Sequence, residues 1–321
     1  MKTDFISDNL GISAATSRRQ VLKRIGLGAA GLTGLNFLSS TALADKGGIG
    51  SKDRAQDIAV LQFALNLEYL EAEYYIYGVT GSGIEQAGAS IFGSGTQGPT
   101  LIKANPLVPF ADSDLQQYAR EIAQDELTHV TFLRTVLQSL GATPAAKPTI
   151  DLLGSWNALA QAAGIGASFD PFANEVNFLL GAFVFEDVGV TAYRGGAPLL
   201  SDKTVLSGAA GLLGTEAYHA GIIRSELFDK RTANPGLLDI VQKISDTRDL
   251  LDGPGDMDQG LLLGGQANLV PTDPNGLVFA RTVQQVLNIV YFAQDAISGG
   301  FFPNGINPGV PVKGRPDKKG R

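Results

Sequence analysis

The chain has 321 residues, a formal net charge of −7 and no cysteine. This length suffices for one large domain or two modest ones. The acidic balance argues against nucleic acid as a partner, because a phosphate backbone is bound by clustered Lys and Arg. Without cysteine there are no disulfides, thiolate metal ligands or cysteine nucleophiles.

Residues 1–44 have the pattern of a cleaved export signal. The run Ser17-Arg18-Arg19-Gln20-Val21-Leu22-Lys23 is typical of a twin-arginine signal, and an apolar stretch from Ile25 ends at the A-x-A pattern Ala42-Leu43-Ala44. We therefore predict export by the twin-arginine machinery to the periplasm or the extracellular space. The alternative is an uncleaved membrane anchor, which the glycines of the apolar stretch disfavour. No later stretch holds 18 unbroken apolar residues, so no stable membrane anchoring is expected after cleavage.

Four segments with helical periodicity and capping residues predict an all-α four-helix bundle. The first runs from about Asp57 to Tyr77, and the second from Asp112 or Ser113 to before Gly141. The third opens with Asp170-Pro171, a cap followed by proline at the first helical position, and continues to about Tyr193. The fourth runs from about Asp202 to Phe228. Each is long enough to serve as a bundle helix.

The connections predict how these helices are joined. Residues 79–110 are rich in Gly, Ser and Pro and should form a long surface loop, while residues 141–169 are long enough to cross the length of a bundle. We expect residues 45–233 to form the bundle and residues 234–321 a C-terminal extension packed on it. Within the extension, residues 281–293 predict one short amphipathic segment before a loop-like, basic tail.

The chain has only two histidines, and each lies three residues after a glutamate. His129 follows Glu126 and His219 follows Glu216, on two different predicted helices. Residues i and i+3 share a helix face, so each pair can point at the same place. A dinuclear carboxylate site uses two such Glu-x-x-His pairs and one glutamate from each of the other two helices.

The remaining two carboxylates can be assigned from the other helices. Glu186 lies in a very apolar segment, where a carboxylate is costly unless a cation neutralises it; the alternative is that it faces solvent or pairs with Arg194. On the first helix Glu68 continues the apolar stripe, with Glu71 as an alternative ligand or a residue that contacts the ligands. Glu73 is expected to be a surface charge.

The predicted ligands are four glutamates and two histidines, which favour iron or manganese over softer metals, although zinc stays open. They are Glu68, Glu126, His129, Glu186, Glu216 and His219. Further residues could orient these ligands through hydrogen bonds, although the tyrosines could equally be ordinary core residues. They are Asp125, Asp187, Tyr75, Tyr193 and Tyr218. Tyr75 lies seven residues after Glu68, as Tyr193 does after Glu186, which suggests two related helix pairs around a pseudo-twofold axis.

At these positions the sequence resembles the ferritin-like family that includes the plant desiccation-related proteins and their bacterial homologues. The segments that carry the likeness are residues 64–75, 125–130, 186–193 and 216–219, with 281–291 and 299–305 resembling the end of the desiccation-related members. The resemblance implies a ferritin-like four-helix bundle with a long crossover between the second and third helices and a C-terminal extension.

We infer a di-metal centre, with iron first and manganese next, that acts on peroxide, dioxygen or Fe(II) as a catalase-like or ferroxidase-like oxidoreductase in stress or desiccation protection. The alternative is a structural, stress-protective protein in which metal only stabilises the bundle. Metal ions and small oxygen species are the expected partners, and a homo-oligomer is left open.

Overall fold

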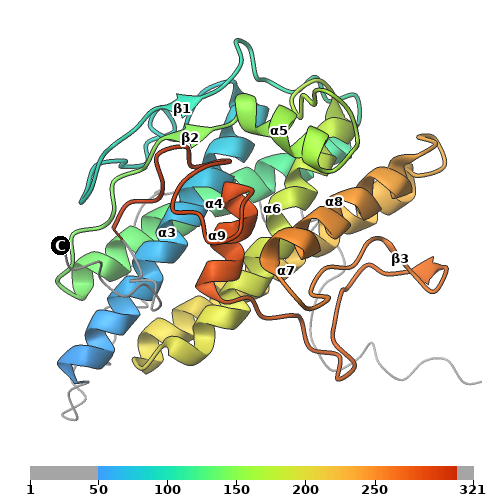
Figure 1. Ribbon diagram of the computed structural model, residues 1–321. Coiled ribbons are helices and arrows are strands. Elements are labelled where there is room, and N and C mark those ends of the chain that lie inside the picture. The colour runs from blue at the N-terminus through green and yellow to red at the C-terminus, as the bar shows by residue number, and fades with distance from the viewer. Residues whose placement is uncertain (1–49, 309–321) are drawn as a thin grey trace, which may run out of the picture. The chain divides into compact units, whose positions relative to one another are not determined.

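The computed structural model describes residues 50–308 (Figure 1). The predicted export signal and the basic tail after residue 308 lie outside the described residues. Within them the structure is mainly helical, with four short strands, and the expected all-α bundle is confirmed.

Four long helices form the bundle. They are α3 (Ser51–Thr80), α4 (Ser113–Ser139), α6 (Glu175–Gly196) and α7 (Lys203–Lys230). Most of the helix contacts join α3 to α4 and α6 to α7, so the bundle is built from two helix pairs. The two pairs meet through contacts of α3 with α6 and of α4 with α7. The interior between the pairs is therefore lined by all four helices.

Side-chain caps fix where these helices begin. The carboxylate of Asp112 accepts hydrogen bonds from the backbone of Asp114 and Leu115, and Asp202 caps α7 in the same way. The third bundle helix begins later than the sequence predicted. Asn174 is its N-cap, because the side chain of Asp170 instead accepts from Phe172 in a preceding turn. The prediction of Asp170 as cap and Pro171 as first helical residue was wrong.

The two long connections lie side by side. Strand β1 (Thr100–Leu101), in the loop between α3 and α4, pairs in parallel with β2 (Ile150–Asp151) of the crossover, with Thr100 opposite Ile150. The crossover also contains α5 (Gly154–Ala162), a helix that the sequence analysis did not predict. Its Trp156 is buried and lies against Tyr74 of α3, so the crossover is part of the core.

The C-terminal part of the described chain packs on the bundle through α8 (Leu237–Asp252) and α9 (Val283–Tyr291). The segment between them contains the short antiparallel strands β3 (Leu262–Leu263) and β4 (Gln266–Ala267). Helix α8 was not predicted, whereas α9 lies within the expected amphipathic segment. A capping box between Thr282 and Gln285 begins α9.

Helix α6 is the most apolar of the bundle helices. Residues 175–199 are long and apolar enough to cross a membrane, with a mean hydropathy of 1.3 over an 18-residue window, but 83% of that window is buried inside the structure. The 3-10 turn η2 (Ala197–Leu199) ends it. The hydropathy of α6 is therefore that of a central core helix, and a carboxylate on it meets other protein groups rather than water.

Candidate metal centre

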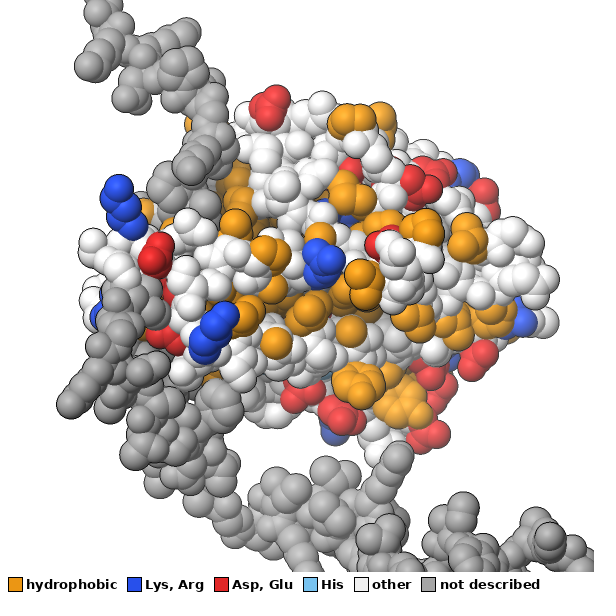
Figure 2. Space-filling view, turned by 90° about the horizontal axis from the view of Figure 1, so that it is seen from below, with side chains coloured by type: hydrophobic (Ala, Val, Ile, Leu, Met, Phe, Trp, Pro, Cys, Tyr) orange, Lys and Arg blue, Asp and Glu red, His pale blue; other side chains and the backbone are white. Residues whose placement is uncertain are grey.

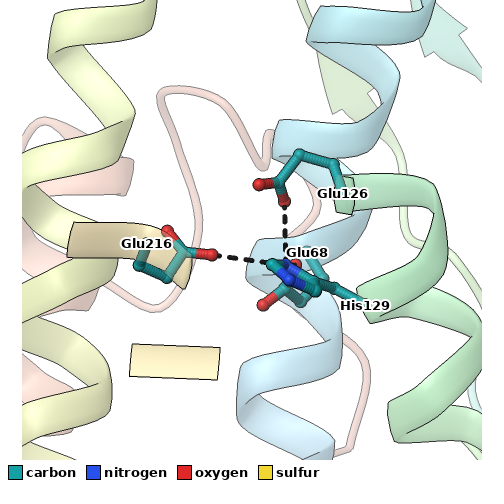
Figure 3. A group of neighbouring side chains, drawn as sticks. All are labelled: Glu68, Glu126, His129 and Glu216. Carbon is teal, nitrogen blue, oxygen red and sulfur yellow. Dashed lines mark ion pairs between the residues drawn. The ribbon is translucent and has the colours of Figure 1, made fainter. Parts of the chain in front are cut away.

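Six acidic and histidine side chains from all four bundle helices meet in the core. Helix α3 supplies Glu68, α4 supplies Glu126 and His129, α6 supplies Glu186, and α7 supplies Glu216 and His219. Their residues are at most 6% exposed. Figure 3 shows Glu68, Glu126 and Glu216 pointing toward the imidazole of His129. These are the six residues that the sequence analysis proposed as ligands, and the structure brings them together.

The six side chains form two overlapping groups. One contains Glu68, Glu126, His129 and Glu216, the other Glu126, Glu186, Glu216 and His219, and within each group the candidate ligand atoms lie within 4.8 Å of one another. Glu126 and Glu216 belong to both groups. Each of these two carboxylates could therefore contact a cation held by either group.

The distances around the two imidazoles support this arrangement. Nδ1 of His129 lies 3.2 Å from Oε2 of Glu68 and 3.4 Å from Oε1 of Glu216. Nδ1 of His219 lies 3.0 Å from Oε1 of Glu126 and 3.6 Å from Oε2 of Glu186. The two ring centroids are 6.0 Å apart. The same nitrogen of each histidine therefore faces the shared interior.

Buried polar atoms without partners are concentrated here. Within residues 50–308, fourteen buried side-chain nitrogen and oxygen atoms have no hydrogen-bond partner, and eight belong to these six residues. The eight include Nδ1 of both histidines and both oxygens of Glu126 and Glu216. Such atoms are costly to bury unless something binds them. Carboxylate oxygens and imidazole nitrogens aimed at common points are the donor set of a transition metal, so the residues fit metal ions.

Burial and the neighbouring charges shift the pKa values of the groups in the centre. Burial opposes the charged form of His129, but attraction by Glu68 and Glu126 outweighs this and raises the pKa of its imidazole well above the ordinary value. Burial likewise opposes the charged form of His219, and attraction by Glu186 raises its pKa. Burial raises the pKa of Glu68 to about 7. Burial and the nearby Glu126 carboxylate raise the pKa of Glu216 well above its usual range. Bound cations would replace the protons that these groups otherwise hold.

Glu126 behaves differently from the other carboxylates of the centre. Burial alone would raise its pKa, but attraction by His129 and His219 outweighs the effect and holds the pKa below the usual range. This carboxylate lies between the two imidazoles, as expected of a residue shared by two metal positions.

Two tyrosines, the buried Tyr75 and the half-buried Tyr193, bind ligand carboxylates reciprocally. The hydroxyl of Tyr75 on α3 donates to Oε1 of Glu186 on α6, and the hydroxyl of Tyr193 on α6 donates to Oε1 of Glu68 on α3. Each bond uses one oxygen of the carboxylate and leaves Oε2 facing the centre. The equal spacing in sequence therefore corresponds to a reciprocal arrangement of the two helix pairs.

Asp125 contacts one of the two histidines. Its Oδ2 lies 3.3 Å from Nε2 of His219, and its side chain is 44% exposed. A carboxylate at Nε2 favours the tautomer with the proton on that nitrogen, which leaves Nδ1 free to bind a cation. Asp125 thus has the orienting position that the sequence analysis proposed for it.

Two other residues proposed to orient the ligands do not contact them. Asp187 forms ion pairs with Arg224 at 2.7 Å and Arg248 at 3.0 Å, so it links α6 to α7 and α8. Tyr218 is 77% exposed, because the residue before His219 points about 100° away around the helix. For these two residues the predicted role was wrong.

The remaining acids of α3 have distinct environments. Glu71 belongs to neither metal group, although burial and the nearby Glu216 raise its pKa well above the usual value. Glu73 is buried, forming an ion pair with Lys147 at 3.1 Å and accepting a hydrogen bond from Thr100. The expectation of a surface charge at Glu73 was wrong, since its partner lies 74 residues away in the sequence.

The sequence analysis missed Gly189 of α6. A Cβ at this position would lie 2.5 Å from Oε2 of Glu216, so only glycine leaves room for that carboxylate. The sequence spacing could have indicated this glycine, because Gly189 follows Glu186 by three residues and therefore lies on the same helix face as that ligand.

Comparison with known proteins agrees with this fold. A family model described as a ferritin-like domain matches residues 56–229. The chain is 32% identical over 248 residues to the desiccation-related protein PCC13-62 of Craterostigma plantagineum, covering 72% of this chain and 76% of that protein. It is 27% identical over 269 residues to the ferritin-like catalase Nec2 of Nesocodon mauritianus, covering 78% of this chain and 83% of that protein.

Proposed function

Because the chain belongs to the ferritin-like domain family, we propose that it holds two metal ions in its core and removes peroxide. The observation that carries the proposal is the pair of overlapping ligand groups that share Glu126 and Glu216. A catalase among the relatives supports peroxide as the substrate. Iron is our first assignment for the metal and manganese the second, because the donor set has four carboxylates and two imidazoles.

The charge of the donor set suits two divalent ions. Four ionised carboxylates carry about −4, which two divalent cations neutralise when both histidines are neutral. A pair of redox-active ions bound this way supplies two electrons to peroxide or takes two from it. Carboxylates that bridge or shift between one and two contacts can follow the change in metal charge without moving the helices.

The protein groups around the ions would fix their positions and exclude water. Tyr75 and Tyr193 each hold one oxygen of a terminal glutamate, which restricts the carboxylate to one orientation. Asp125 holds the proton on Nε2 of His219. Its partly exposed side chain also gives a proton a path between the surface and this imidazole.

We further propose that this chemistry takes place outside the cytoplasm. The support is the twin-arginine pattern and the A-x-A sequence at residues 17–44. Removal of peroxide there would fit stress or desiccation protection, which the name of one relative suggests. Export is tested by amino-terminal sequencing of protein recovered from its own host, where the expected first residue is Asp45.

The function is tested by metal content and turnover measured together. Protein isolated from its own host should contain about two equivalents of iron or manganese and should release dioxygen from H₂O₂ at an oxygen electrode. The double variant His129→Ala, His219→Ala should lose both the metal and the activity. The matched control is Tyr218→Phe, whose exposed side chain lies beside His219 in the sequence but outside the centre. A protein with only trace transition metal would refute the proposal.

A second function is favoured by the desiccation-related relative, in which the metal would only hold the bundle together. Chelation separates the two functions. If removal of metal lowers the melting temperature while H₂O₂ and Fe(II) are untouched by the loaded protein, the structural function is correct. Oxidation of Fe(II) without release of dioxygen from H₂O₂ would instead indicate a ferroxidase-like activity.

A further inference from the structure

A cavity of about 590 Å³ lies next to the centre, a size typical of small-molecule sites. Its walls come from residues 55–71 of α3, the second half of α6, η2, Ala209 of α7 and the segment that begins α9. We call it the inlet pocket. Figure 2 views the molecule from below Figure 1, where the start of α3 and the α6–α7 connection lie, and shows hydrophobic side chains gathered around a hollow.

The inlet pocket runs from the surface toward the metal ligands. Its outer end includes the exposed residues Gln56 and Leu199, and its inner end includes the buried Glu71 and Gly189. Small and aliphatic side chains line most of the path between them. An apolar wall of this kind favours a ligand with a hydrocarbon part.

The inner end of the inlet pocket touches the centre itself. Tyr193 lines the pocket and donates its hydroxyl hydrogen bond to Glu68. Gly189 lines it too, and a Cβ there would meet a carboxylate oxygen of Glu216. A ligand that fills the pocket therefore ends within contact distance of residues that touch two of the metal ligands.

Glu71 gives the inner end a polar group aimed at a ligand. The residue is only 6% exposed, and within residues 50–308 its side chain has no hydrogen-bond or ion-pair partner. Other buried acids outside the centre have such partners, as Glu73 does in Lys147 and Asp187 does in two arginines. The carboxyl oxygens of Glu71 are not among the fully buried atoms without a partner, so they are open to the inlet pocket, where a polar group of a bound molecule is their natural complement.

The wall of the inlet pocket has no cation to offer in the described part of the chain. Arg281 is its one basic side chain there, and its guanidinium is taken by Asp252, at 2.7 Å, and by Asp258. A ligand carboxylate or phosphate would remain unneutralised. The ligand that fits is neutral, apolar along most of its length and polar at one end.

We propose that the inlet pocket binds the hydrocarbon part of a neutral organic hydroperoxide and places its O–O group beside Glu71 and Tyr193. The inference rests on the proposed peroxide chemistry and adds a substrate class to it. In the net reaction the organic hydroperoxide takes two electrons and two protons, its O–O bond breaks, and an alcohol and water form. One H₂O₂ supplies those electrons and protons and is oxidised to dioxygen, so that ROOH + H₂O₂ gives ROH + H₂O + O₂.

The test compares two peroxides on variants of the full chain. Ala64→Phe and Ala192→Phe place a ring in the inlet pocket without altering a ligand, and Ala210→Phe makes the same change on an exposed face of α7 outside it. We expect the metal-loaded protein with H₂O₂ to reduce cumene hydroperoxide to 2-phenyl-2-propanol. Each pocket variant should lower kcat/KM for cumene hydroperoxide by roughly tenfold or more while H₂O₂ disproportionation stays within about twofold. Ala210→Phe should change neither.

Binding is measured separately from turnover. Ligand-observed NMR should detect 2-phenyl-2-propanol on the protein with and without metal, and Ala64→Phe should abolish the signal at an unchanged melting temperature. Active H₂O₂ turnover without reduction of cumene hydroperoxide would overturn the inference and leave the proposed function standing. Absence of turnover with both peroxides would overturn the function, and with it the hydroperoxide as substrate, even if the alcohol still binds. If the alcohol binds only after removal of residues 1–44, or only to a dissociated monomer, the chain itself occupies the pocket and the proposal is wrong.

Discussion

Replacing Tyr75 or Tyr193 with phenylalanine should weaken one metal position at a time. Tyr75 binds Glu186, which belongs to the group with His219, and Tyr193 binds Glu68, which belongs to the group with His129. Phenylalanine keeps the ring and its packing but removes the hydroxyl. The carboxylate then loses the bond that fixes its orientation and keeps a buried oxygen without a partner.

The size of the effect follows from the kind of bond removed. A hydrogen bond to a charged group contributes about 1.5–3 kcal/mol. Loss of a residue that orients a metal ligand typically weakens metal binding about 10–100-fold, which corresponds to about 1.4–2.7 kcal/mol. The two estimates agree, so we expect each variant to lose one to two orders of magnitude in affinity for one of two ions. Because the tyrosines hold different ligands, the double variant should weaken the binding of both ions.

The measurement is a chelator competition that resolves two metal equivalents, followed by elemental analysis of what remains. Tyr74→Phe is the matched control, since Tyr74 is equally buried and adjacent but donates to the backbone oxygen of Phe178. It should lower the melting temperature without changing either metal affinity. Equal losses of metal in Tyr74→Phe and Tyr75→Phe would show that packing, not the bond to Glu186, supports the ion, and our reasoning would then fail.

Three further predictions concern the same centre and its support. Burial raises the pKa of Glu68 to about 7. Below that pH the carboxyl of Glu68 in the metal-free protein holds a proton that a metal ion must displace. Chelator competition should therefore show the affinity for metal falling from about pH 8 to about pH 5. Gly189→Ala should reduce metal content, since its Cβ would lie 2.5 Å from a bridging carboxylate oxygen, whereas Gly211→Ala, with open space at that position, should not. Arg248→Met should cost about 3–5 kcal/mol in urea unfolding, because the buried carboxylates of Asp187, Asp252 and Asp258 then have two arginines, Arg224 and Arg281, in place of three. Lys243→Met, at a partly exposed pair, should cost under about 1 kcal/mol.

Regular patterns in the sequence predicted the bundle and the two Glu-x-x-His pairs. Helical periodicity and spacing are local properties, so they can be read without knowing which segments meet. Helix α5 has only nine residues inside a long connection, and α8 lies in the C-terminal extension, where the sequence analysis predicted only the segment 281–293. Short helices of this kind are stabilised mainly by packing on the bundle, which the sequence does not display.

Pairing between distant residues was not predictable in the same way. Glu73 looked like a surface charge because Lys147 lies on a separate connection, and Asp187 looked like a neighbour of the centre because Glu186 precedes it. Adjacent helical residues point about 100° apart, so Asp187 turns away toward Arg224 while Glu186 turns inward. Helix geometry alone could have corrected Asp187, whereas Glu73 required the tertiary structure.

The two halves of the centre correspond at their glutamates, histidines and tyrosines, and one asymmetry between them lies at the inlet pocket. Glu68 and Tyr75 correspond to Glu186 and Tyr193 at the same spacing, so Glu71 corresponds to Gly189. A Cβ at Gly189 would lie 3.4 Å from Oε1 of Glu71. The side chain of Glu71 therefore lies against the space that the absence of a side chain at Gly189 leaves open. A purely structural metal site would gain nothing from one buried acid without a partner. The asymmetry therefore favours a centre in which the metal position next to Glu68 and Tyr193 faces a bound molecule.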